Sequence, residues 1–143
     1  MIVLDTTVLV YAAGAEHPLR EPARAIIEAV GEGRLAATTT PEVIQEFVHV
    51  RLRRRDRRDA ARLGRSYTTL LAPLAVVGEV ELSAGLDLFE RTDGLGAFDC
   101  VLSAAALARD AQALVSADGS FRAVRGLPFV DLGSSACLEL AAR

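Results

Sequence analysis

Short apolar runs alternate along this chain with longer segments in which apolar residues recur at helical spacing. A short run with β-branched members favours a buried strand, whereas the longer spacing is typical of an amphipathic helix. The predicted strands are Ile2–Leu4, 35–38, Ala113–Ser116 and 128–131, while 74–77 fits either a strand or a buried connector. The predicted helices are 18–30, a segment from Pro41, another running towards Leu71, 79–91, 97–109 and a short C-terminal helix.

Turn and capping residues separate these segments. Thr40, Pro41 and Glu42 form a helix start, with a hydroxyl cap, a proline in the first turn and then an acid. That helix runs into a block of arginines, where Asp56 either caps or interrupts it. The segment 97–109 is apolar on nearly all sides, which indicates a central, buried helix. Strands that alternate with helices predict an α/β fold with a parallel sheet covered on both faces.

Length and composition limit the class of protein. The chain has 143 residues, of which 51% are hydrophobic and 24% charged, which fits one globular domain with its own core. Its longest uncharged stretch, 66–78, is broken by Pro73 and is too short to span a bilayer. The N-terminus lacks the basic start of a secretory signal, and two cysteines cannot form a disulfide framework. We therefore expect a single domain over residues 1–143 in a reducing, cytoplasmic setting.

Four acidic residues from four separate segments lie next to otherwise apolar predicted elements. Asp5 directly follows the first strand, and Asp118 lies two residues beyond the strand Ala113–Ser116. Ligands bind outside the carboxyl ends of the strands in an open parallel sheet, where these two carboxylates would stand. Asp99 lies in the first turn of the apolar helix, and Glu46 lies at the border of an apolar helix face. A buried carboxylate costs several kcal/mol unless it is paired, so Asp5 in particular needs a counter-charge.

Three of these acids, taken singly, also have a structural explanation. Asp99 could stabilise a helix dipole, Asp118 could be a turn residue before glycine, and Glu46 could face solvent. Taken together they need positive charge, yet the chain has no lysine, and half of its arginines lie in one distant block. A divalent cation is the simplest counter-charge, and hard oxygen ligands favour Mg²⁺ or Mn²⁺. Several carboxylates around such an ion are what phosphodiester hydrolysis requires.

The motifs around these acids occur in a fixed order: IVLDTTVL from residue 2, then PEVIQEF, AFDCVLSAAA and SADGSF. Together they resemble the signature of PIN-domain ribonucleases, and the chain length and the opening at residue 2 resemble the VapC toxins of type II toxin–antitoxin systems. The similarity extends to about residue 131. It implies a three-layer α/β/α sandwich with a short central parallel sheet. It also implies a Mg²⁺- or Mn²⁺-dependent endoribonuclease whose catalytic and metal-binding acids are Asp5, Glu46, Asp99 and Asp118.

The resemblance also implies supporting residues and partners. Thr6 or Thr7 would orient Asp5 or a metal-bound water through a hydroxyl, and Ser116 would do similar work near Asp118. Water activated by the metal would attack an RNA phosphate in line. Family members usually form dimers, and a cognate antitoxin inserts a segment that blocks the site. We therefore expect an RNA substrate, an antitoxin partner and a homodimer.

The sequence departs from the commonest family pattern in two places. Thr7 stands where serine or asparagine is frequent and keeps a hydroxyl, while Cys100 replaces a small residue and is nearly as small. Glu42 competes with Glu46 because the two lie one turn apart. Glu46 is preferred, since Glu42 already has a role at the cap and dipole of its helix.

The positive charge of the chain is concentrated in one segment. All 16 basic residues are arginine, and eight of them lie in 51–65, which carries +6 while the rest of the chain carries −9. Such a block can bind a phosphate backbone, an acidic partner surface, or only solvent. The residues we expect to bind RNA or a partner are Arg51, Arg53, Arg54 and Arg55.

Two other classes of protein compete with the ribonuclease interpretation. A response-regulator receiver domain would need a lysine, which this chain lacks. A non-catalytic PIN-like module that binds RNA or a protein without cutting stays an alternative, although the presence of all four acids favours the enzyme.

Overall fold

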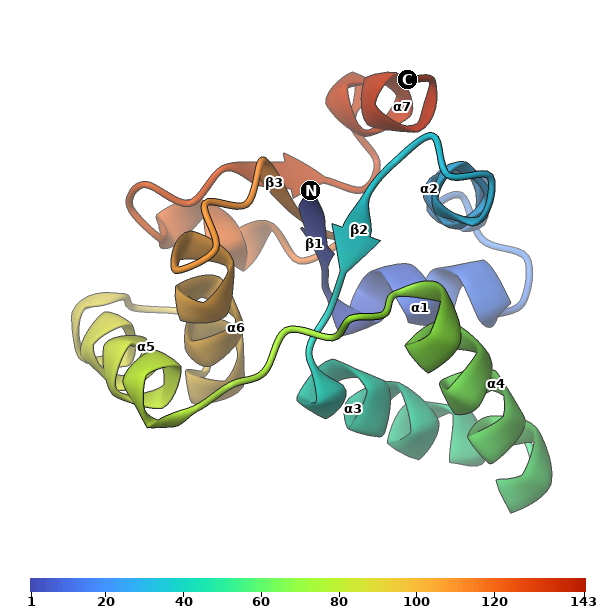
Figure 1. Ribbon diagram of the computed structural model, residues 1–143, viewed down its shortest axis with the longest axis horizontal. Helices are drawn as coiled ribbons and strands as arrows, with labels where there is room; N and C mark the ends of the chain where they lie inside the picture. The colour runs from blue at the N-terminus through green and yellow to red at the C-terminus, as the bar shows by residue number, and fades with distance from the viewer.

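Strand β1 (Ile2–Leu4) lies inside a parallel sheet whose strand order is β2-β1-β3-β4 (Figure 1). The computed structural model describes residues 1–143, and the remaining strands are β2 (Ala37–Thr38), β3 (Ala113–Ser116) and β4 (Phe129–Asp131). Leu4 stands beside Val115 in the register of β1 and β3, so these two strands end at the same edge of the sheet. The four predicted strands are confirmed, with the second shortened to two residues.

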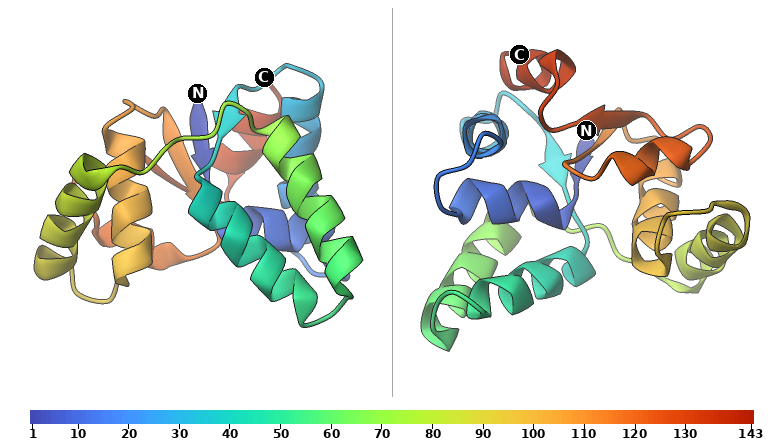
Figure 2. Two further views of the ribbon diagram at one scale, coloured as in Figure 1. Left: turned by 60° about the horizontal axis from the view of Figure 1, so that its bottom comes forward. Right: turned by 180° about the vertical axis from the view of Figure 1, so that it is seen from behind.

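Helices cover the sheet on both sides, as Figures 1 and 2 show. Helices α5 and α6 form a pair on one side, while α1, α2 and α7 lie on the other side. Helices α3 and α4 form a hairpin near the end of β1 at which α1 begins. This arrangement confirms the predicted α/β/α sandwich. The helical bounds are α1 Thr6–Ala13, α2 Arg20–Gly31, α3 Pro41–Leu52, α4 Arg57–Leu70, α5 Glu79–Arg91, α6 Ala97–Leu107, the 3₁₀ helix η1 Gly119–Ala123 and α7 Ser135–Ala141.

The strands β1 and β3 are buried along their whole length, which explains why both read as continuous apolar runs. Phe47 of α3 packs edge-on against Tyr67 of α4, with ring centroids 5.0 Å apart. Phe121 of η1 stacks on Phe129 of β4 at 6.1 Å. Because the sheet is covered on both faces, a polar side chain can reach solvent only where a strand ends.

The predicted helix starts are confirmed, except that the helix predicted from residue 18 begins at Arg20. Thr40 caps α3 by accepting a hydrogen bond from the backbone N of Val43 at 3.3 Å. Asp56 caps α4 and therefore separates it from α3, accepting from the backbone N of Asp59 at 2.8 Å. The apolar helix α6 ends at Leu107, two residues before the predicted end.

Besides the short 3₁₀ helix η1, the structure adds one α-helix that helical spacing does not predict. Helix α1 has the sequence TTVLVYAA, which is apolar on most sides and rich in β-branched residues. Such residues have low helix propensity, so this segment is helical because of its cap and its buried position. Residues 74–77, which by sequence fit either a strand or a connector, form a connector that is held where Ala75 N donates to Thr39 O at 2.9 Å.

Candidate active site

All four predicted acids line one cavity of about 320 Å³. Asp5 follows β1 and Asp118 follows β3, so two of them come from the carboxyl ends of neighbouring parallel strands. Asp99 reaches the cavity from the first turn of α6, and Glu46 reaches it from α3. The remaining lining residues are Thr6, Thr7, Val10, Tyr11 and Val50.

Asp5 is the most firmly held of the four. Asp5 is buried, and only 4% of the residue is exposed to solvent. Its Oδ2 accepts hydrogen bonds from the hydroxyls of Ser116 at 2.6 Å and Thr7 at 2.8 Å, and from the backbone N of Thr7 at 3.3 Å. The last bond also caps α1, because the positive end of a helix favours a carboxylate. Asp5 is therefore fixed in position by three hydrogen bonds.

The two threonines of α1 form hydrogen bonds with different acids. Thr7 bonds to Asp5, whereas the hydroxyl of Thr6 donates to Glu46 Oε2 at 2.5 Å. Thr7 therefore contacts Asp5, while Thr6 contacts an acid 40 residues away. Nothing in the local sequence indicates this second contact.

Ser116 connects the ends of the two strands. Its hydroxyl donates to Asp5 and accepts from the backbone N of Asp118 at 2.9 Å. The carboxylate of Asp118 in turn accepts from the backbone N of Ser120 at 2.8 Å and caps η1. Ser116 thus contacts both Asp118 and Asp5.

The negative charges of this cavity are not neutralised by the protein. None of the ion pairs in the chain includes any of the four acids. Burial, followed by the charges of Asp5, Asp118 and Glu46, raises the pKa of Asp99 to about 7. A carboxylic acid with such a pKa marks a site that is electrostatically unbalanced and suited to a cation.

The donor set fits a hard divalent cation in its chemistry, since four carboxylates with supporting hydroxyls are oxygen ligands. The side chains as they stand share the cavity without converging, and no group of three or more His, Cys, Asp or Glu is arranged to hold an ion. The four acids therefore fit such an ion by their chemistry and by the cavity that they share.

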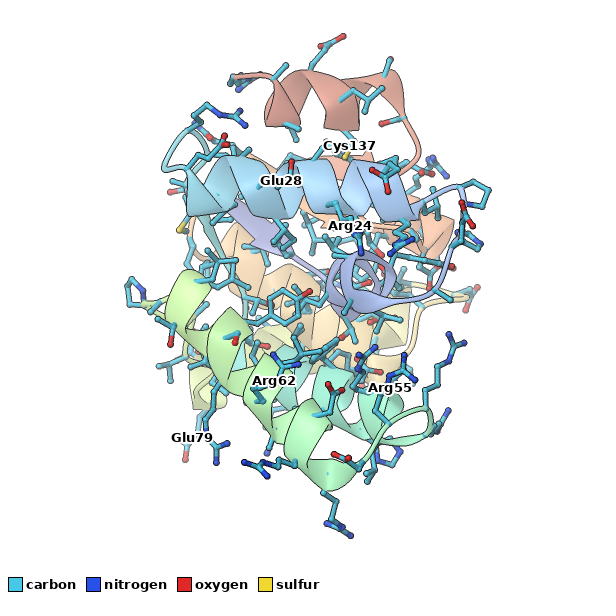
Figure 3. All side chains as sticks on the ribbon, turned by 90° about the vertical axis from the view of Figure 1, so that its right-hand side faces the viewer. Arg24, Glu28, Arg55, Arg62, Glu79 and Cys137 are labelled. Atoms are coloured by element: carbon cyan, nitrogen blue, oxygen red, sulfur yellow. The ribbon has the colours of Figure 1, made fainter.

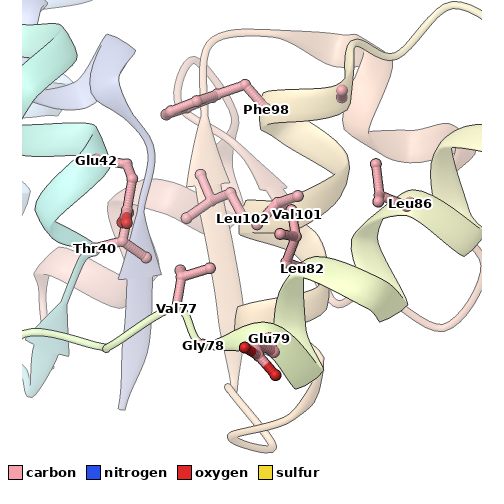
Figure 4. Close-up of a pocket in the computed structure, with 11 residues that line it drawn as sticks. Thr40, Glu42, Val77, Gly78, Glu79, Leu82, Leu86, Phe98, Val101 and Leu102 are labelled. Atoms are coloured by element: carbon pink, nitrogen blue, oxygen red, sulfur yellow. The ribbon is translucent and has the colours of Figure 1, made fainter.

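Glu42, the competitor of Glu46, lines a different cavity. This second cavity, of about 600 Å³, lies between α6, α5 and the connector before α5, and we call it the apolar cleft (Figure 4). One oxygen of Glu42, Oε2, is buried there without a hydrogen-bond partner. Sequence reasoning missed this cleft because its residues come from several elements: Thr40, Glu42, Val77, Gly78, Glu79, Leu82, Leu86, Ala97, Phe98, Val101 and Leu102.

The predicted arginines are not equivalent. Arg51 is tied down, because its guanidinium pairs with Asp59 at 2.8 Å and donates to the backbone O of Ala13 at 3.0 Å. The hydrogen bond from Arg51, together with one from Arg62, holds the pKa of the Asp59 carboxyl below its ordinary value. Arg53, Arg54 and Arg55 are exposed and form no ion pair.

Comparison with known proteins points to one family. A family model described as PIN domain matches residues 2–127. Ribonuclease VapC7 of Mycobacterium tuberculosis is 59% identical over 122 residues, which are 85% of this chain and 84% of that protein. Ribonuclease VapC23 of the same species is 36% identical over 104 residues, which are 69% of this chain and 78% of that protein.

Two solved VapBC structures share the fold. VapBC2 from Rickettsia felis, bound to a DNA fragment from its promoter, superposes with a TM-score of 0.70 at 15% identity and covers 92% of this chain and 98% of the matched chain. VapBC-1 from nontypeable Haemophilus influenzae superposes with a TM-score of 0.68 at 16% identity and covers 94% of this chain and 100% of the matched chain.

The chain therefore belongs to the PIN-domain family, as the family model, the parallel sheet and the shared acidic cavity together indicate. Its identity to two VapC proteins places it among the VapC-type members of that family. None of its helices is both long and apolar enough to cross a membrane.

Proposed function

We propose that this protein is a metal-dependent endoribonuclease that hydrolyses RNA phosphodiester bonds, and that it is the toxin of a VapBC-type pair. The observation that carries the proposal is the cavity shared by four acids that the protein does not neutralise. The names of the similar proteins VapC7 and VapC23, both ribonucleases, support the same activity. A non-catalytic RNA-binding module would not need this unbalanced cluster.

Asp5, Glu46, Asp99 and Asp118 are the residues that would hold Mg²⁺ or Mn²⁺. Such an ion polarises a phosphate and lowers the pKa of water, which makes a nucleophile available at neutral pH. The hydroxyls of Thr7 and Ser116 keep Asp5 fixed in the buried wall. Glu46 is oriented by Thr6. Asp99, whose pKa is raised to about 7 by burial and by the charges of the other three acids, is a carboxylate that a bound cation would stabilise.

The test is cleavage of single-stranded RNA by an Asp5→Asn variant in the presence of Mg²⁺ or Mn²⁺. Asn keeps the shape of the side chain and accepts the same hydrogen bonds at its oxygen, but it removes the charge that would hold the metal. We expect cleavage to fall by about 10²-fold or more, with the melting temperature and RNA binding retained.

The matched control is Asp87→Asn, which removes one carboxylate from the exposed face of α5 and should leave cleavage unchanged. Cleavage by Asp5→Asn at the wild-type rate would contradict the site assignment. A wild-type protein that binds RNA but never cleaves it would favour the non-catalytic module.

We further propose that the apolar cleft receives a segment of the antitoxin. The cleft adjoins the acidic cavity, since Phe98 lines one and Asp99 the other, and Glu42 and Glu46 lie one turn apart. Exposed apolar side chains along α5, among them Leu82 and Leu86, are typical of a surface that a partner covers. A partner with a basic group among apolar residues would also pair with the buried oxygen of Glu42.

The homodimer implied by the resemblance stays a prediction. Light scattering of the purified chain, alone and with its antitoxin, measures both the number of copies and the composition of the complex. A mass that corresponds to a single copy over the full concentration range would contradict the dimer.

A further inference from the structure

A third cavity, of about 470 Å³, lies at the C-terminal end of α1, and we call it the arginine cavity. It brings together arginines from α2, from α3 and from the loop after α3. Figure 3 shows Arg24 on α2 and Arg55 at the end of the α3–α4 hairpin, with α1 seen nearly end-on between them. The only acid in the lining is Glu16; the arginines are Arg20, Arg24, Arg51, Arg54 and Arg55.

Two of these arginines form hydrogen bonds within the protein itself. Arg24 Nε donates to the backbone O of Ala12 at 3.1 Å, and Arg51 donates to the O of Ala13 at 3.0 Å while it pairs with Asp59. These bonds satisfy carbonyls at the negative end of α1, where cations are favourable. Arg24 and Arg51 therefore form the wall of the cavity.

The other three arginines have unused donors. Arg20 Nε is shielded from solvent and has no hydrogen-bond partner, which is costly for a donor unless a ligand supplies an acceptor. Arg54 and Arg55 are exposed and form no ion pair. Planar guanidinium groups that face one cavity match the oxygens of a phosphate group.

The arginine cavity and the acidic cavity share two helices. On α1, Val10 and Tyr11 line the acidic cavity and Ala13 lines the arginine cavity. On α3, Glu46 lines the first and Arg51 the second. Val50 of α3 also lines the acidic cavity and directly precedes Arg51, so the two cavities adjoin along this helix.

We propose that the arginine cavity binds a backbone phosphate of the RNA substrate, beside the acidic cavity in which the bond is cut. Arg20, Arg54 and Arg55 contact this phosphate, and Arg24 and Arg51 hold the cavity in shape. The proposal rests on the ribonuclease function proposed above, and it adds two arginines of α2 to a binding surface that the arginine block alone does not define.

The experiment measures binding of a fluorescent single-stranded RNA by anisotropy, in EDTA so that no metal-dependent cleavage occurs, over a range of salt concentrations. The test variant is Arg20→Gln with Arg55→Gln. The control is Arg58→Gln with Arg65→Gln, which removes the same charge from a separate arginine surface on α4. We expect the test variant to bind about tenfold more weakly and its salt slope to fall by about 0.7, because one phosphate is no longer neutralised, with little change in the control.

Equal weakening by the test and control variants would overturn the proposal, because binding would then depend on net charge alone. Unchanged binding by the test variant would overturn it as well. If Arg20→Gln prevents folding, Arg54→Gln with Arg55→Gln tests the same cavity through exposed residues. If polyglutamate binding falls while RNA binding does not, the cavity belongs to an acidic protein.

This assay is independent of the proposed catalysis. It contains no metal and scores binding only, whereas Asp5→Asn is scored by cleavage with metal present. Absence of the arginine effect therefore leaves the ribonuclease proposal intact, and normal cleavage by Asp5→Asn leaves the binding result interpretable.

Discussion

Helix α1 has a cavity of opposite charge at each of its ends, and the two cavities differ in how far the protein compensates their charge. At the N-terminal end, Asp5 accepts a hydrogen bond from the first turn of the helix and lies in the acidic cavity. At the C-terminal end, Arg24 and Arg51 donate to the carbonyls of the last two residues and line the arginine cavity. Both arrangements complement the helix dipole. In each cavity, however, more charge is present than the helix end requires.

The protein compensates the excess charge of the arginine cavity more completely than that of the acidic cavity. In the arginine cavity, Arg51 has an acidic partner, and the unpaired Arg54 and Arg55 extend into solvent. In the acidic cavity, hydroxyl groups orient the carboxylates but cannot neutralise them, so burial and repulsion raise the pKa of Asp99. We therefore expect a bound cation at the acidic cavity to change stability more than any change at the arginine cavity.

The largest expected effect is stabilisation by divalent metal. A ligand at 100 times its dissociation constant stabilises the folded state by about 2.7 kcal/mol, which raises the melting temperature of a chain of this size by about 5–10 °C. Addition of Mg²⁺ or Mn²⁺ should therefore raise the melting temperature of the wild type, measured by calorimetry.

The same shift should be absent in Asp5→Asn and kept in the Arg20→Gln with Arg55→Gln variant. A shift of equal size in Asp5→Asn would mean that the metal binds elsewhere. In that case, the stabilisation by metal would not distinguish the acidic cavity from the arginine cavity.

The second effect is a pH dependence of the metal-free protein. The pKa of Asp99 is about 7 in the folded chain against an ordinary value of 3.8, so the folded state binds more protons between these values. This contribution to stability is fully present below about pH 4 and is lost as the pH rises through 7. We expect urea denaturation in EDTA to show a loss of about 1 kcal/mol between pH 5 and pH 8, allowing for solvent screening.

Asp99→Asn removes the titrating group and should remove this part of the pH dependence. The difference between variant and wild type isolates the contribution of Asp99 from those of other groups. A variant with the same slope as the wild type would show that neither burial nor repulsion raises the pKa of Asp99 in the folded chain.

The smallest expected effect is on the melting temperature, and it distinguishes Arg51, which bonds to the protein, from the exposed Arg54. Arg51→Gln loses the bond to the carbonyl of Ala13, and we expect the melting temperature to fall by about 2–4 °C, the shift produced by roughly 1 kcal/mol in a domain of this size. Arg54→Gln is the matched control and should leave it unchanged. Equal shifts in the two variants would show that the bonds of Arg51 contribute nothing to folding.

Most elements of the fold could be predicted from local patterns. The strands are short apolar runs because both faces of the sheet are covered, and Thr40 and Asp56 mark helix starts through bonds that span three residues. Helix α1 could not be predicted in this way, since its residues favour strands and its helical form depends on the surrounding core. The connector at 74–77 is equally apolar in sequence but finds no strand to pair with.

In the candidate site, likewise, the identity of the residues could be predicted from local sequence but their contacts could not. Each of the four acids could be selected from its position beside an apolar element. The contacts that orient them could not, because Thr6 reaches Glu46 across 40 residues and Ser116 reaches Asp5 across 111. The apolar cleft and the arginine cavity are likewise assembled from segments with no common local signal.

The sequence by itself determined the strands, most helices and the identity of the acids, because these depend on hydrophobic period, caps and neighbours within one or two turns. Only the tertiary structure decided that the acids share one cavity, that Thr6 serves Glu46, and that Arg20 joins the arginines of a distant block. The physical reason is that side-chain convergence is set by how buried elements pack, and packing depends on contacts between residues far apart along the chain.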